Sequence, residues 1–220
     1  MSEPIELLIW VRGPGLQIAL GLLLFGVLLR LVEIFSLGRK ADLSPAARRP
    51  GASGWHTIVR RSLDHQTLGK HALIGMLLGY IFHIGLFVTV LLYIPHIELF
   101  KGVFGFAWPG LPSPVVDAVT VVTLITLAVV AIDRYADPVK RLLSNFDDWL
   151  SLLLTLLPLL TGYLAYHHLL LPYQQMLALH ILSAEVLIAA LPFTKLVHAV
   201  TIWISRWYNG ELFGRKGVAS

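Results

Sequence analysis

The chain contains five long apolar stretches, which lie approximately at residues 16–35, 72–94, 115–132, 149–166 and 175–204. About 20 apolar residues span a bilayer as a helix, so each stretch is a candidate membrane span. Of the 220 residues, 56% are hydrophobic and only 14% are charged, which is too much apolar surface for a water-soluble core of this size. We therefore predict an all-α, multi-pass integral membrane protein, a single five-helix bundle formed by residues 1–220 and covered by the lipid bilayer.

Lysine and arginine alternate between the connections. The first connection, residues 36–70, holds Arg39, Lys40, Arg48, Arg49, Arg60, Arg61 and Lys70, and the second holds only Lys101. The third holds Arg134, Lys140 and Arg141, the fourth holds none, and the tail holds Arg206, Arg215 and Lys216. Cytoplasmic connections carry the excess of basic residues. The pattern predicts an N-terminus outside, a C-terminus in the cytoplasm, and a cell inner membrane location. We also expect a short basic helix before Lys70.

Several classes of protein are disfavoured by composition. There are no cysteines, which excludes disulfides, thiolate metal sites and covalent c-type haem attachment. The net charge is +4, but the basic residues lie between apolar runs, so no nucleic-acid partner is expected. The first segment lacks the basic start and cleavage site of a removed signal peptide. Any redox centre would have to be bound by histidine.

The chain has nine histidines, and two of them lie on the fifth predicted helix. His180 and His198 are 18 residues apart, which is five turns of a regular helix and about 27 Å along its axis. Both would then face the same way. This spacing is typical of two stacked haems, each bound by one histidine of this helix and one of another helix.

The second predicted helix offers His83, His96 and His71 as the partners. On a regular helix His83 and His96 are about 140° out of phase, and His71 and His83 are about 120° out of phase. Pro95 precedes His96 and would kink the end of the helix, which weakens the phase argument. Geometry alone does not choose between His96 and His71.

The other histidines are expected at surfaces or interfaces: His56, His65, His167 and His168. A zinc site is disfavoured, because its ligands must converge on one point. Glu185 lies between the two histidines of the fifth helix and is a functional candidate, since an intramembrane carboxyl needs a reason to be there. Glu98 and Lys101 are candidate proton or quinone contacts, although a solvated loop is the simpler interpretation, and Lys195 could snorkel.

Motifs in two helices carry a family resemblance. Phe82-His83-Ile84-Gly85, and His180 followed by Leu191-Pro192-Phe193-Thr194-Lys195-Leu196-Val197-His198, resemble the gamma, or cytochrome b, subunit of respiratory nitrate reductases and related membrane anchors of heterodisulfide reductase-like and sulfite-reducing complexes. The resemblance implies a cytochrome with two b haems. Such a subunit exchanges electrons with a membrane quinone or quinol near the outer face and passes them to a cytoplasmic iron-sulfur subunit of an oxidoreductase complex.

Residue by residue, the resemblance implies that His83 and His198 are the axial ligands of the cytoplasm-proximal haem and that His180 is one ligand of the distal haem. In the nitrate reductase pattern the second ligand of the second helix comes about ten residues after the first, where this chain has Tyr93. The longer spacing to His96 is similar to the broader anchor family. His96 is therefore assigned as the fourth ligand, with His71 in reserve.

Two rival functions remain at this point. A proton-coupled transporter could use intramembrane histidines as a relay, and it would be expected to have broken helices and two related halves, neither of which we find in the sequence. A haem-free membrane anchor would use its histidines in hydrogen bonds between helices.

Overall fold

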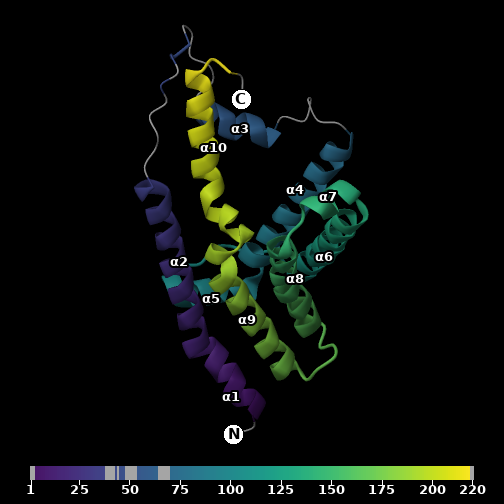
Figure 1. Ribbon diagram of the computed structural model, residues 1–220. Coiled ribbons are helices and arrows are strands. Elements are labelled where there is room, and N and C mark those ends of the chain that lie inside the picture. Colours follow the sequence, from purple (N-terminus) through teal and green to yellow (C-terminus); the bar gives the residue numbers. More distant parts are fainter. Residues whose placement is uncertain (1–2, 38–42, 44, 48–53, 64–69, 219–220) are drawn as a thin grey trace. The chain divides into compact units, whose positions relative to one another are not determined.

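The computed structural model describes residues 3–37, 43, 45–47, 54–63 and 70–218. Within these residues every regular element is a helix (Figure 1). Five helical stretches are long and apolar enough to cross a membrane: Ile5–Ser36, Leu73–Leu92, Ser113–Ala136, Phe146–Tyr166 and Tyr173–Phe193. The predicted all-α, multi-pass membrane architecture is confirmed. The orientation of the termini stays a prediction.

The chain divides into two compact units. The first unit comprises Met1–Leu20 and Lys70–Ala189, and the second comprises Gly21–Gly69 and Ala190–Ser220. That residues 1–220 act as one cytochrome domain stays a prediction.

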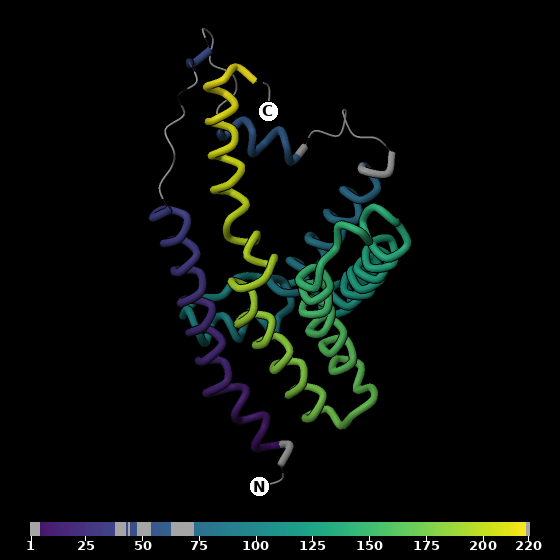
Figure 2. The backbone as a smooth tube through the Cα atoms, in the orientation of Figure 1, coloured from purple at the N-terminus to yellow at the C-terminus, as the bar shows by residue number. Residues whose placement is uncertain are grey.

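Small and hydroxyl-bearing side chains join two helices of the first unit, α4 (Lys70–Leu92) and α6 (Ser113–Ala136), which lie side by side (Figure 2). A Cβ on Gly85 would overlap Thr123, so the glycine allows the two backbones to approach closely. Thr89 Oγ1 and Thr120 Oγ1 lie 3.1 Å apart and form a hydrogen bond between the helices. Close backbone approach and interhelical hydrogen bonds are the usual means of packing helices in lipid.

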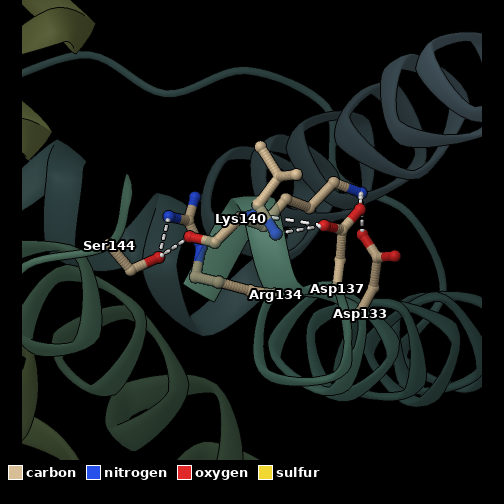
Figure 3. A network of polar contacts seen from close by, with 6 residues as sticks. Asp133, Arg134, Asp137, Lys140 and Ser144 are labelled. Carbon is tan, nitrogen blue, oxygen red and sulfur yellow. Dashed lines mark hydrogen bonds and ion pairs between the residues drawn. The ribbon is translucent and has the colours of Figure 1, made fainter. Parts of the chain in front are cut away.

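A polar network lies at the C-terminal end of α6, where α7 (Pro138–Leu143) leads into α8 (Phe146–Tyr166). Lys140 Nζ lies 2.5 Å from Asp133 Oδ2, and Arg134 Nη1 donates to Ser144 Oγ at 3.0 Å (Figure 3). Helix α8 then begins with a capping box, in which Asn145 and Asp148 satisfy each other's backbone N–H groups. These contacts fix the connection between two membrane spans.

The second span ends before Pro95. Tyr93 is extended, with φ −81° and ψ 123°, and a separate helix, α5 (Ile94–Phe104), follows it. The irregularity expected from Pro95 is therefore confirmed, and His96 lies in the first turn of the new helix. The region from Pro95 onward, expected as a loop, is helical as far as Phe104 because the proline occupies a first-turn position, where its missing N–H is not needed.

In the second unit, the short helix α3 (Gly54–Leu63) packs on α10 (His198–Arg215). A Cβ on Gly54 would meet the Trp207 ring at 2.6 Å, and a Cβ on Gly210 would meet Thr57 Oγ1 at 2.5 Å. Arg206 Nη1 donates to Ser62 Oγ at 2.6 Å. The expected short basic helix in the first connection is present, and glycines on both partners let it lie close to α10.

The fifth helix is not continuous, which corrects the expectation of one regular helix over residues 175–204. Helix α9 (Tyr173–Ala190) ends in a short 3-10 turn, Leu191–Phe193, and Thr194 is extended with φ −119° and ψ 178° before the chain re-enters α10 through a second 3-10 turn, Lys195–Val197. Pro192 cannot donate to the helix and clashes one turn back. Arg30 of α2 (Leu16–Ser36) donates from Nε to the Pro192 carbonyl at 3.0 Å.

Candidate functional site

His96 and His180 lie beside each other in the first unit. Their ring centroids are 5.9 Å apart and their planes differ by 20°. One residue comes from the first turn of α5 and the other from the middle of α9, so residues 84 positions apart in sequence are brought together. Metal–imidazole bonds are about 2.0–2.1 Å long, so two imidazoles on opposite sides of one ion have their bonded nitrogens about 4 Å apart and their ring centres farther apart. The observed separation fits such a pair.

The His180 ring is seated against α8. Its Nδ1 lies 3.0 Å from the carbonyl oxygen of Pro158. A Cβ on Gly162, one turn further along α8, would lie only 2.9 Å from Cε1 and 3.1 Å from Nδ1 of His180. The missing side chain at Gly162 is therefore what allows the imidazole to reach the Pro158 carbonyl.

The His96 ring is held by the end of α4. Its Nδ1 lies 3.0 Å from the Thr89 carbonyl oxygen, and the Tyr93 ring meets it edge-on at a centroid distance of 5.2 Å. Burial lowers the pKa of His96, although its hydrogen bonds to the carbonyls of Thr89 and Val90 act in the opposite direction. The neutral imidazole, which is the form that binds a metal, is therefore favoured at this position.

The other two candidate ligands, His83 and His198, also place Nδ1 against a backbone carbonyl oxygen. His83 Nδ1 lies 2.7 Å from the Gly79 carbonyl oxygen in α4, and His198 Nδ1 lies 2.7 Å from the Lys195 carbonyl oxygen at the start of α10. His83 belongs to the first unit and His198 to the second. Both rings are on the outside of their units.

The shared contact determines the tautomer of all four histidines. A carbonyl oxygen only accepts, so each Nδ1 carries the proton and donates it, and each neutral ring keeps its lone pair on Nε2. Histidines that bind metals almost always donate the other ring N–H to a carbonyl or carboxylate in this way. In His96 and His180, Nε2 is therefore the ring nitrogen that could bind a metal.

The break in the fifth helix affects the expected orientation of His180 relative to His198. Both were expected to face the same way because they are five turns apart on a regular helix, and that reasoning is wrong because residues 191–197 interrupt the helix. The reserve ligand His71 lies in α4, but its side chain is outside the described residues. His65 is also outside them. His56 is exposed on α3.

Glu185 is buried and its Oε1 has no hydrogen-bond partner among the described residues. It faces a π-helical turn, Val11–Gly15, where a Cβ on Gly15 would lie 2.8 Å from its Oε2. Glu98 and Lys101 are exposed and pair with each other at 3.6 Å, as a solvated segment would. Lys195 is exposed and contributes its carbonyl to His198.

One functional candidate was missed in the sequence. His167, expected as an interfacial residue, has its Nε2 2.9 Å from Oδ1 of Asp117, a residue near the start of α6. Because 50 positions separate the two, neither spacing nor periodicity could have paired them. The signal in the sequence that could have identified this site is Asp117, a carboxylate inside an apolar stretch.

Among the described residues, no group of three or more His, Asp or Glu side chains could hold a metal ion by itself. A haem iron takes four of its ligands from the porphyrin, so it needs only the two axial imidazoles from the protein. His96 and His180 are two imidazoles that lie close together, which is the number of protein ligands that a haem iron would require.

A curated protein of Nitratidesulfovibrio vulgaris (strain Hildenborough), whose name states no activity, is similar to this chain, with 36% identity over 137 residues. The aligned part covers 62% of this chain and 60% of the relative, so the chain matches less than two thirds of the relative's length. No known protein family matches the chain. No solved structure matches it either.

Proposed function

We propose that the protein is the membrane subunit of an oxidoreductase complex and binds two b-type haems. His96 and His180 would bind the outer haem, and His83 and His198 the inner one. The subunit would transfer electrons between the membrane quinone pool and a cytoplasmic iron-sulfur subunit, which it would also anchor. The observation that carries the proposal is the facing pair of His96 and His180, each with its Nδ1 on a backbone carbonyl and its Nε2 as the ligand atom.

The haem supplies a one-electron iron couple, and the protein sets its axial ligands, orientation and surroundings. The residues around the pair are suited to that task. Pro158 and Thr89 hold the two rings through their carbonyls, Gly162 leaves room for one ring, and Tyr93 packs against the other. Pro158, Gly162 and Thr89 come from helices of one unit, and Tyr93 is the single residue that joins α4 to α5, so the ring positions do not depend on a long loop.

The first test is a count of haem per chain. We expect the detergent-purified protein to show b-type bands in a dithionite-reduced minus oxidised spectrum and two haems per chain by pyridine haemochrome. His96→Ala and His180→Ala should each retain one haem, because each removes one ligand of the same iron. His168→Asn is the matched control, since His168 is also near the end of a span but has the positive φ of 55° that asparagine tolerates.

Two haems in His96→Ala would move the ligand role to His71. A well-folded wild-type protein without haem would overturn the proposal.

The alternative function is a haem-free anchor or a proton-coupled transporter. Two features favour this alternative: the broken fifth helix, and the buried Glu185, whose Oε1 has no hydrogen-bond partner among the described residues. Ionisable groups and interrupted helices are both typical of transporters. It predicts a colourless protein. In proteoliposomes, a transporter would dissipate an imposed pH gradient in the wild type and not in Glu185→Gln, whereas an anchor would dissipate it in neither.

A further inference from the structure

The first unit has a second polar site besides the proposed haem ligands. It lies at the end of the unit where α6 begins, α8 ends and α9 begins. His167 caps the C-terminus of α8, and Asp117 lies in the first turns of α6. Their side chains are 34% and 26% exposed, so the pair is partly open.

The end of α8 fixes the position of His167. The Leu169 N–H donates to the Leu164 carbonyl at 2.9 Å and the His168 N–H donates to the Ala165 carbonyl at 3.3 Å, while His168 has a left-handed φ of 55°. This is a Schellman motif, a common and rigid way to end a helix. His167 is therefore held on a fixed backbone and not on a mobile loop.

The contact with Asp117 determines which nitrogen of His167 can act as a base. An ionised carboxylate only accepts hydrogen bonds, so the imidazole Nε2, which lies 2.9 Å from Oδ1, carries the proton. The lone pair of the neutral ring is then on Nδ1. A carboxylate that orients an imidazole also stabilises the imidazolium formed when the ring takes up a proton.

Aromatic rings connect this pair to the proposed outer haem site. The His167 ring meets Tyr166 at a centroid distance of 5.0 Å, Tyr166 meets Tyr93 at 6.3 Å, and Tyr93 meets His96 at 5.2 Å. Two tyrosine rings thus lie between His167, which could accept a proton, and His96, a proposed ligand of the haem that would accept an electron.

We propose that His167 is the proton acceptor for a hydroquinone oxidised at this end of the protein and that Asp117 is its positioning residue. The inference rests on the proposed function, because the electron acceptor is the ferric b haem named there. A hydroquinone loses two electrons and two protons to become a quinone. The electrons reduce two ferric haems to ferrous haems, the first proton moves from a quinol hydroxyl to Nδ1 of His167, and water takes the second. The imidazolium then releases its proton to water.

The test measures the rate at which the hydroquinone menadiol reduces the haems, together with the binding of heptyl hydroxyquinoline N-oxide, a fluorescent quinol analogue. General bases contribute about 10²–10⁴-fold to a rate. We therefore expect His167→Gln and Asp117→Asn each to slow haem reduction by about 100-fold or more. The analogue's Kd should rise by less than about tenfold, which corresponds to the loss of one hydrogen bond.

The double variant should be no slower than the slower single variant, because the two residues act as a unit. Asp117→Glu should recover part of the rate, because it restores the carboxylate. His168→Asn is the matched control and should keep the wild-type rate and Kd.

The inference would be overturned by rates within twofold of wild type, by a rate loss that is matched by an equal rise in Kd, or by loss of dithionite-reducible haem in every variant of the pair. The last result would make the pair structural. The dithionite spectrum of the wild type distinguishes this failure from failure of the proposed function, which would leave the wild type itself without haem.

Discussion

At the residue scale, the protein prepares its candidate ligands with backbone carbonyls. His83 and His198 use carbonyls four and three residues earlier in the chain, whereas His180 uses the Pro158 carbonyl of a neighbouring helix. His96, in α5, uses the Thr89 carbonyl of the preceding helix α4, so the position of His180 is the one that depends on packing between helices far apart in the sequence. Gly162 is the residue that this site tolerates changing least, because the imidazole occupies the space where a Cβ would be.

We expect Gly162→Ala to displace the His180 ring. The added Cβ would lie 2.9 Å from Cε1 of the imidazole, and overpacking of this kind costs about 1–3 kcal/mol. The variant should retain the inner haem and lose the outer one, so pyridine haemochrome should fall from two haems per chain toward one. Gly75→Ala in α4 is the control, because a Cβ there meets nothing within 4 Å. Equal haem content in both variants would show that His180 does not depend on this seat.

At the element scale, the structure is determined by where helices stop. Tyr93 separates α4 from α5 and thereby frees His96 from the phase of His83, and residues 191–197 separate α9 from α10. The second interruption is held by α2: a Cβ on Gly26 would overlap the Pro192 ring, and Arg30 binds the Pro192 carbonyl. Arg30 also pairs with Glu33 at 2.8 Å.

Arg30→Gln should destabilise this interruption. A hydrogen bond from a charged donor to a carbonyl contributes about 1.5–3 kcal/mol, and partial exposure places Arg30 near the lower end of that range. We expect the free energy of unfolding in detergent to fall by about 1–2 kcal/mol. Glu33→Gln breaks only the partly exposed ion pair and should cost less than about 1 kcal/mol. If the two variants were equally stable, the contact between Arg30 and Pro192 would have no structural role.

The spans could be predicted from the sequence because hydropathy and length depend on local composition. The ends of helices were less predictable: Pro95 indicated an irregular end correctly, whereas Pro192 was read inside a regular helix because apolar residues continue on both sides of it. The pairing of His96 with His180 was assigned by resemblance, since helical phase argued against His83 with His96. The pairing of His167 with Asp117 depends on which helices are neighbours, and a single sequence does not contain that information.

At the scale of the whole molecule, the two polar sites of the first unit share one end. Asp117 follows the start of α6, His167 follows the end of α8, and His96 follows the end of α4, so all three lie beside connections with few basic residues. The opposite end of α6 and α8 carries Arg134, Lys140 and Arg141. Basic residues are retained on the cytoplasmic side, so this distribution predicts that the proposed quinol chemistry takes place outside.

Reporter fusions test that orientation directly. Alkaline phosphatase is active only outside the cytoplasm, so we expect activity for fusions within residues 105–112 and 167–172 and none within residues 137–145 or at the C-terminus. Green fluorescent protein should give the complementary pattern, because it fluoresces after folding in the cytoplasm. As a control on the cause, Lys140→Gln with Arg141→Gln should weaken the contrast across the third connection, since these two residues supply two of its three positive charges. The reversed pattern would place His96, His180, His167 and Asp117 at the cytoplasmic face, and quinol oxidation there would release its protons inside.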